Sequence, residues 1–250
     1  MIIKLNSIKF ILKKMYVYFF SKTIIYNNKY HQNRNKTSFG LAIPIVGYHS
    51  QFIPELLSLI LKSEVLPDEV SISMSSSNIT FDNFDYPFKL IITQTKYFQN
   101  AAQNRNTAAR KLKTDIISFF DADDIPHIKR ISYLMHAFDM GANVVVHNFF
   151  QSSIRNLDFA VSKIENINLF PNSINSTNTT CQFPVSNSFW HKYACGHISI
   201  KRKTFIKFRY NESKLYLRRE DAEFASRLVK NNIFISYIEN ELSLYFKYDK

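Results

Sequence analysis

The sequence predicts an α/β fold in which a mostly parallel, Rossmann-like sheet is sandwiched by helices. Short apolar runs alternate with segments of helical periodicity between residues 41 and 147. One of these runs, Asp115–Phe120, leads directly into a turn that carries the carboxylates Asp121, Asp123 and Asp124. Open α/β folds bind their ligands at the carboxyl ends of their strands, so this acidic turn is the first candidate for a functional site.

Two periodicities define the expected elements. The predicted strands are 41–46, 70–74, 88–92, 115–120, 143–147, 198–201 and 234–238. The predicted helices are 52–63, 98–112, 128–138 and one that begins near Arg219. Residues 151–195 are rich in Ser, Asn and Thr, and we interpret them as a structured acceptor-side region, with a flexible insert as the alternative.

The basic residues are concentrated at the N-terminus. Residues 1–38 contain eight Lys or Arg and no Asp or Glu, and subtracting these eight from the total of +12 leaves +4 for the remaining 212 residues. We therefore predict a basic N-terminal extension over 1–38 and a globular domain over 39–250. A domain this close to neutral argues against nucleic acid as a partner.

The extension has two interpretations. Its apolar stretch Met15–Phe20 is closely flanked by lysines, is too short to span a bilayer and lacks the features of a secretory signal. It could rest on an anionic membrane surface, or form a helix on the domain followed by a polar linker at 27–37.

Cys181 and Cys195 match neither a zinc pattern nor a disulfide framework, so we predict a cytoplasmic location, with peripheral membrane contact as an option.

The acidic turn suits a divalent cation. Carboxylates held close together repel one another, and hard oxygen ligands of this kind favour Mg²⁺ or Mn²⁺. Asp121 and Asp123 are the predicted metal ligands, and a solvated acidic turn is the alternative. Asp124 stands just before Ile125 and Pro126, a position that predicts a helix cap.

Three segments, taken in order, resemble a known family. They are Ala42-Ile43-Pro44 running to Pro67-Asp68-Glu69-Val70, then Asn104–Ala109 before Phe120–Asp124, and Arg218–Phe224. Together they resemble a family 2-type glycosyltransferase with a GT-A fold, over roughly residues 40–235. The resemblance implies transfer of a sugar, as in a hexosyltransferase, from a nucleotide-sugar donor (a UDP-sugar is favoured) to a glycan, protein or small-molecule acceptor. It also implies Mn²⁺ or Mg²⁺ as cofactor and inversion at the anomeric carbon.

The resemblance assigns site residues by position. Asp123 of the DxD motif would be the chief metal ligand, with Asp121 supporting the metal or contacting the ribose. Asp221 would be the general base that takes the proton of the acceptor hydroxyl, with Glu220 as its neighbour. The implied donor-binding residues are Pro44, Gly47, Tyr48, Ser75, Arg105, Asp121 and Ala122. Trp190 and His197 are the acceptor-side candidates, and His197 is also the nearest candidate for the late histidine ligand of some family members.

Other interpretations stay open. The Ser-rich loop that begins at Ser75 stands where family members commonly have an acidic residue, and no His follows residue 232. Both departures favour a non-catalytic carbohydrate- or partner-binding GT-A module. A sugar nucleotidyltransferase is the other alternative, although Gly47–Ser50 is a poor match for a Gly-rich basic loop.

Single residues also have structural alternatives. Arg105 could simply pair with a carboxylate, and acidic residues at 220 and 221 also suit the first turn of a helix.

Overall fold

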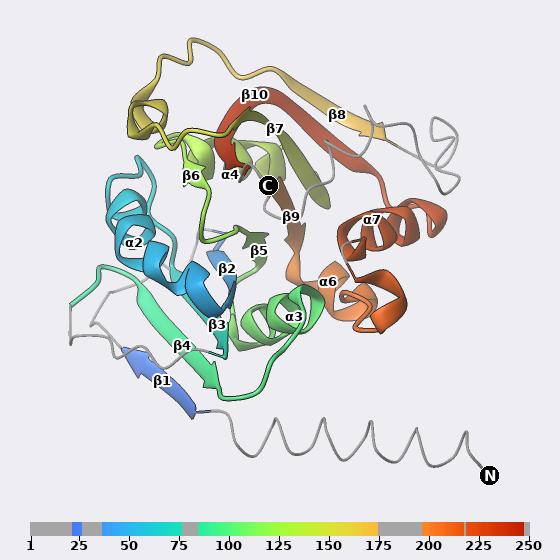
Figure 1. The fold of residues 1–250 in the computed structure, drawn as a ribbon. Coiled ribbons are helices and arrows are strands. Elements are labelled where there is room, and N and C mark those ends of the chain that lie inside the picture. The colour runs from blue at the N-terminus through green and yellow to red at the C-terminus, as the bar shows by residue number, and fades with distance from the viewer. Residues whose placement is uncertain (1–21, 27–36, 77–84, 175–196, 218, 248–250) are drawn as a thin grey trace.

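The computed structural model describes residues 22–26, 37–76, 85–174, 197–217 and 219–247. In chain order the elements are β1 (Lys22–Tyr26), β2 (Phe39–Val46), η1 (Gly47–Phe52), α2 (Ile53–Leu61), β3 (Glu69–Ser75), β4 (Lys89–Thr95), α3 (Ala101–Lys111), β5 (Ile116–Phe119), β6 (Ile125–Pro126), α4 (Arg130–Asp139), β7 (Val144–Ser152), η2 (Leu157–Val161), β8 (Leu169–Ile174), β9 (Ile198–Lys201), α6 (Arg202–Phe208), η5 (Lys214–Tyr216), α7 (Glu220–Lys230) and β10 (Ile235–Phe246). Figure 1 shows their arrangement. Every strand and helix expected from the sequence is present, and β1, β6, β8 and α6 are additional.

One sheet runs through the described part of the chain, in the order β1-β4-β3-β2-β5-β9-β7-β10-β6, with β8 also paired to β10. Parallel pairing joins β4, β3, β2 and β5, and it also joins β7 to β10. Because β9 is antiparallel to both β5 and β7, β7 and β10 run in the same direction as β5. The mostly parallel sheet is therefore confirmed, and the carboxyl ends of these six strands share one edge with the amino end of β9.

Helices cover both faces of the sheet. On one face, the apolar sides of α2 and α4 pack against alternate residues of the strands, such as Ile43 and Ile72. On the other face, α3, α6 and α7 pack against residues such as Ile117, Val146 and Ile200 (Figure 1). Side chains alternate between the two faces of a strand, and β2, β5, β7 and β10 accordingly contribute residues to both apolar clusters.

The predicted N-terminal extension contributes a strand to the sheet. β1 pairs antiparallel with β4, from Lys22↔Gln94 to Tyr26↔Leu90, and covers an otherwise open edge. The predicted membrane-contacting stretch 15–20 and linker 27–37 lie almost wholly outside the described residues. No helix in the described ranges is long and apolar enough to cross a membrane.

Asp124 does not cap a helix, which corrects the sequence-based prediction. Helix α4 begins only at Arg130, and Pro126 belongs to β6, which pairs with Ser243 and Leu244 of β10. Asp124 is buried, and its Oδ1 accepts a hydrogen bond of 3.0 Å from the backbone N–H of Phe246. Pairing with a strand more than a hundred residues away has overridden the local capping pattern, which a sequence window cannot detect.

Candidate active site

The acidic turn lies at the edge where the parallel strands end. β5 is anchored beside β2, and the N–H of Phe120 donates to the carbonyl of Ala42 at 3.1 Å. The turn then closes on itself, since the N–H of Asp124 donates to the carbonyl of Asp121 at 3.3 Å. The sheet therefore delivers the aspartates to the edge where α/β folds bind ligands, as the sequence predicts.

Arg105 joins this turn to the start of α7. Its Nη2 donates to both carboxylate oxygens of Asp121, at 2.8 and 3.1 Å, and its Nη1 donates to Glu220 Oε1 at 2.9 Å. The arginine is buried, with 5% of its surface exposed, so both ion pairs are shielded from solvent. The structure thus has Arg105 paired with carboxylates, the alternative left open by the sequence. Its pair with Glu220 joins residues that are 115 positions apart in the sequence.

Three consecutive polar residues of α3 reach three different parts of the molecule. Asn104 Nδ2 donates to Ser75 Oγ at 2.9 Å and to the carbonyl of Ile45 at 3.2 Å, which fixes the ends of β2 and β3. Arg105 faces the acidic turn, and Asn106 faces the segment that leads to α7. Successive residues of a helix point about 100° apart, so one turn of α3 can organise all three.

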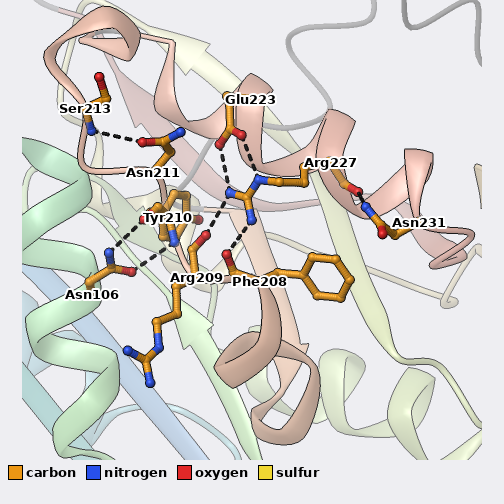
Figure 2. Close-up of polar contacts among 9 residues, drawn as sticks. All are labelled: Asn106, Phe208, Arg209, Tyr210, Asn211, Ser213, Glu223, Arg227 and Asn231. Atoms are coloured by element: carbon orange, nitrogen blue, oxygen red, sulfur yellow. Dashed lines mark hydrogen bonds and ion pairs between the residues drawn. The ribbon is translucent and has the colours of Figure 1, made fainter.

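The segment before α7 is held by side chains on both sides, as Figure 2 shows. Asn106 Nδ2 donates to the carbonyl of Tyr210 at 2.9 Å, and Asn106 Oδ1 accepts the Tyr210 N–H at 3.0 Å. From α7, Arg227 forms a bidentate pair with Glu223 at 2.7 and 2.8 Å and donates to the carbonyls of Phe208 and Arg209. These contacts satisfy backbone groups of an irregular connection that would otherwise cost free energy, and they hold residues 208–210 between α3 and α7.

The acid pair of the sequence lies in the first turn of α7. Glu220 is buried against Arg105, while Asp221 is partly exposed and accepts the N–H of Ala222 at 2.8 Å. Burial and then the charge of Glu220 raise the pKa of Asp221 to about 6. A carboxylate with a pKa just below neutral is mostly ionised at pH 7 and is still basic enough to accept a proton.

His49 is a site residue that sequence reasoning missed. Gly47 follows β2 directly with a φ of +52°, a conformation natural to glycine, and the η1 turn that it begins brings His49 Nδ1 to 3.3 Å from Asp123 Oδ2. The hydrogen bond to Asp123 is the largest cause that raises the pKa of His49. The only available signal was the position of His49 just after the first buried strand of the domain.

Two further arginines fix the backbone of the acidic turn. Beneath it, the fully buried Arg130 donates to the carbonyl of Phe119 at 3.1 Å and to His147 Nε2 at 3.0 Å. Beside it, Arg155 donates to the carbonyl of Asp123 and pairs with Glu55 of α2. The turn is therefore held in place from α3, α4 and the connection after β7.

The remaining donor-binding and acceptor-side candidates differ in how exposed their side chains are. Tyr48 is 66% exposed, Pro44 is partly exposed, and Ala122 is buried directly within the acidic turn. Ser75 is fully buried and its hydroxyl is engaged with Asn104, so its side chain does not face solvent. His197 is fully buried at the start of β9.

Two predicted features fall elsewhere. Trp190 lies outside the described residues, as does most of the Ser-rich loop after β3. A polar cleft lined by Phe159, Ser162–Asn166, Asn168, Asn240 and Glu241 contains none of the predicted site residues.

The aspartates suit a cation only in part. In the described ranges no group of three or more His, Cys, Asp or Glu side chains could hold a metal ion. Both oxygens of Asp121 accept from Arg105, which leaves Asp123, with His49, as the protein ligand that is better placed. Mg²⁺ is commonly bound through one or two carboxylates together with substrate phosphates, so Asp123 fits a cation whose other ligands arrive with the donor.

The chain is similar in structure to known proteins. It resembles S. aureus TarS residues 1–349 solved with UDP (TM-score 0.62, 13% identity, 84% of this chain and 60% of that one). It also resembles the same fragment with UDP-GlcNAc (TM-score 0.60, 15% identity, 85% of this chain and 59% of that one). A further S. aureus TarS structure is matched over 84% of this chain and 37% of its own length (TM-score 0.62, 14% identity). These likenesses show the fold, and this chain spans less than two thirds of each TarS chain. No match was found among curated proteins.

The sequence itself carries the family signal. The model for glycosyl transferase family 2 matches residues 43–215, which is more than half of the chain and includes the second half of β2, α3 and the acidic turn. Together with a GT-A fold like that of TarS, this confirms the resemblance found in the sequence. The chain belongs to glycosyl transferase family 2.

Proposed function

We propose that this glycosyltransferase moves a hexose from a nucleoside-diphosphate sugar, with a UDP-sugar favoured, to an acceptor hydroxyl. A divalent Mn²⁺ or Mg²⁺ assists, and the anomeric carbon is inverted. The observation that carries the proposal is the Arg105 bridge, which joins Asp121 of the acidic turn to Glu220 beside Asp221. Donor-side and acceptor-side carboxylates are thereby held around one edge of the sheet. The S. aureus TarS fragments with UDP and UDP-GlcNAc support the choice of donor.

Each residue has a distinct task in this reaction. Asp221 takes the proton from the acceptor hydroxyl as the new glycosidic bond forms, which a pKa of about 6 allows at neutral pH. Glu220 orients the start of α7 through Arg105, so we assign it a positioning role rather than that of the base. A cation held by Asp123, when bound, would stabilise the negative charge that develops on the departing diphosphate. Inversion follows if Asp221 lies opposite that diphosphate.

The remaining predicted contacts complete the proposal. Gly47, Tyr48 and His49 follow β2 and are well located to contact the nucleotide, since Tyr48 is exposed at the strand end. The acceptor is a glycan, a protein or a small molecule. A cytoplasmic location and membrane contact through the N-terminal extension stay predictions from the sequence.

The test is release of nucleoside diphosphate from a panel of nucleotide-sugars, with and without Mn²⁺ and with simple sugars as acceptors. The proposal predicts metal-stimulated release of UDP from one or more UDP-sugars. Donor binding without any turnover across the panel would instead support the non-catalytic module, and incorporation of sugar phosphate into a nucleotide would support the nucleotidyltransferase.

A further inference from the structure

Tyr245 is fixed beside the acidic turn by the residues on either side of it. Leu244 pairs with Ile125 of β6, and the N–H of Phe246 donates to Asp124 Oδ1 at 3.0 Å. Tyr245 therefore lies between one residue that pairs with β6, just after the turn, and another that contacts the side chain of Asp124 in the turn. It stands at the carboxyl end of β10, on the same edge of the sheet as the end of β5.

The ring of Tyr245 lies on the opposite face of β10 from its two neighbours. Leu244 is buried with Ile125, and the ring of Phe246 lies 5.5 Å from the guanidinium of Arg155. Side chains alternate along a strand, so Tyr245 points the other way. Its ring centroid lies 5.5 Å from that of Phe149, the partly exposed residue near the end of β7.

His197 extends this aromatic group into β9. Its ring centroid is 4.3 Å from Phe149 and 6.4 Å from Tyr245. Adjacent ends of β9, β7 and β10 thus present a wall of aromatic rings at the edge that carries the acidic turn. Tyr245 and Phe149 keep part of their surface accessible, while His197 is fully buried behind them.

The hydroxyl of Tyr245 stands within electrostatic reach of the acid residues on both sides of the site. Burial and then the charges of Asp124, Asp121, Asp123 and Asp221 raise the pKa of Tyr245 to about 12. The phenol accordingly keeps its proton at any working pH and can donate a hydrogen bond. No described residue makes a hydrogen bond with this hydroxyl.

We infer that Tyr245 binds the transferred sugar of the donor, with Phe149 extending the apolar surface on which the sugar ring rests. Carboxylates only accept hydrogen bonds, and the Arg105 guanidinium is already held by two of them, so the phenol supplies a neutral donor that a sugar oxygen can use. β10 is separated from β2 by β5, β9 and β7, and this favours the sugar rather than the nucleotide, which we assign to the end of β2. This inference rests on the proposed function and adds a sugar subsite to it.

Calorimetry with UDP and with UDP-GlcNAc, in the presence of Mn²⁺, tests the inference on the full chain. Tyr245→Phe removes one hydroxyl and keeps the ring. It should weaken UDP-GlcNAc binding about threefold to tenfold, the effect of one lost hydrogen bond, with UDP affinity and the melting temperature unchanged. Tyr237→Phe is the matched control on the same strand, beside Val146 and away from the acidic turn, and it should change neither affinity.

The outcomes separate the two ideas. Equal UDP-GlcNAc affinities of the wild type and Tyr245→Phe would overturn the sugar subsite and leave the proposed function in place. An equal loss of affinity for UDP and for UDP-GlcNAc in Tyr245→Phe would have the same meaning. A wild-type protein that binds neither ligand would overturn the choice of donor in the proposed function, and the subsite with it.

Discussion

The two halves of the sheet are built in different ways. In the N-terminal half, β2, β3, β4 and β5 follow one another along the chain with α2 and α3 between them, and each strand pairs in parallel with a neighbour. In the C-terminal half, β9 inserts between β5 and β7, and β10 returns to pair with both β7 and β6. The first half supplies the acidic turn and the second supplies α7 and the aromatic wall. The proposed catalytic arrangement therefore depends on contacts that cross between them.

The crossing contacts come mainly from α3. Asn104 secures the N-terminal half through Ser75 and the carbonyl of Ile45, whereas Arg105 and Asn106 reach the residues around α7. A single helix thus serves both halves. Substitutions that affect the two halves differently test whether the halves contribute separately to donor binding and to transfer.

The largest effect is expected at Asp123, in the N-terminal half. Asp123→Ala should reduce sugar transfer by about a thousandfold or more, because it removes the proposed ligand of the cation that stabilises the leaving diphosphate. Transfer rates with saturating Mn²⁺ measure this. Asp139→Ala, at the exposed end of α4, is the control and should transfer normally. Normal transfer by Asp123→Ala would remove the metal assignment.

Asp221 represents the C-terminal half. Asp221→Asn should keep UDP-sugar affinity but lower kcat by about 10² to 10⁴, since a general base contributes on this scale. Calorimetry and initial rates on the same preparation measure the two quantities. If kcat is unchanged, a different residue accepts the proton.

The same variant should also be more stable. The pKa of Asp221 is raised to about 6, above the ordinary value of an aspartate, so the folded state favours the protonated form and its stability falls as the pH rises from that ordinary value through about 6. Asn carries no charge. At pH 8, Asp221→Asn should therefore have an unfolding free energy up to about 2 kcal/mol higher than that of the wild type, and it should unfold at a higher temperature. The difference should disappear near pH 4, and a gain that persists there would point to another cause.

The ion pair between the halves is tested by a double-mutant cycle. Arg105→Met and Glu220→Gln should each reduce kcat more than donor affinity, and their coupling in unfolding free energy should be about 1–3 kcal/mol because the pair is buried. Chemical denaturation of the four proteins gives this coupling. Additive effects would show that Arg105 serves Asp121 alone. Arg110→Ala, on an exposed part of α3, is the control.

Asn106 tests the connection before α7 with a smaller effect. Asn106→Ala leaves the N–H and carbonyl of Tyr210 without their partner and should cost about 1–3 kcal/mol of stability. Donor binding should persist, because the N-terminal half keeps Asn104. Equal losses of nucleotide binding and of transfer in Asn106→Ala would mean that the two halves of the sheet do not contribute separately to these two steps.

The sequence revealed much of the N-terminal half and less of the C-terminal half. The strands before residue 120 have clear apolar runs, and the Asp121–Asp124 turn follows one of them, so both the sheet and the acidic site could be predicted. Asp124 was misassigned because its partner, the N–H of Phe246, lies 122 residues away. Tyr245 and His49 were missed for the same reason: their position beside the acidic turn depends on strand pairing and on the η1 turn, which leave no local pattern.

The proposed reaction depends most on Asp123, which we expect to hold a cation that in turn holds the diphosphate of the donor. Calorimetric titration of UDP into the wild-type protein, with Mn²⁺ and without it, tests this most directly. We expect clearly tighter UDP binding with Mn²⁺ than without it in the wild type, and the same weak binding under both conditions in Asp123→Ala. Equal affinities with and without Mn²⁺ in the wild type would contradict it.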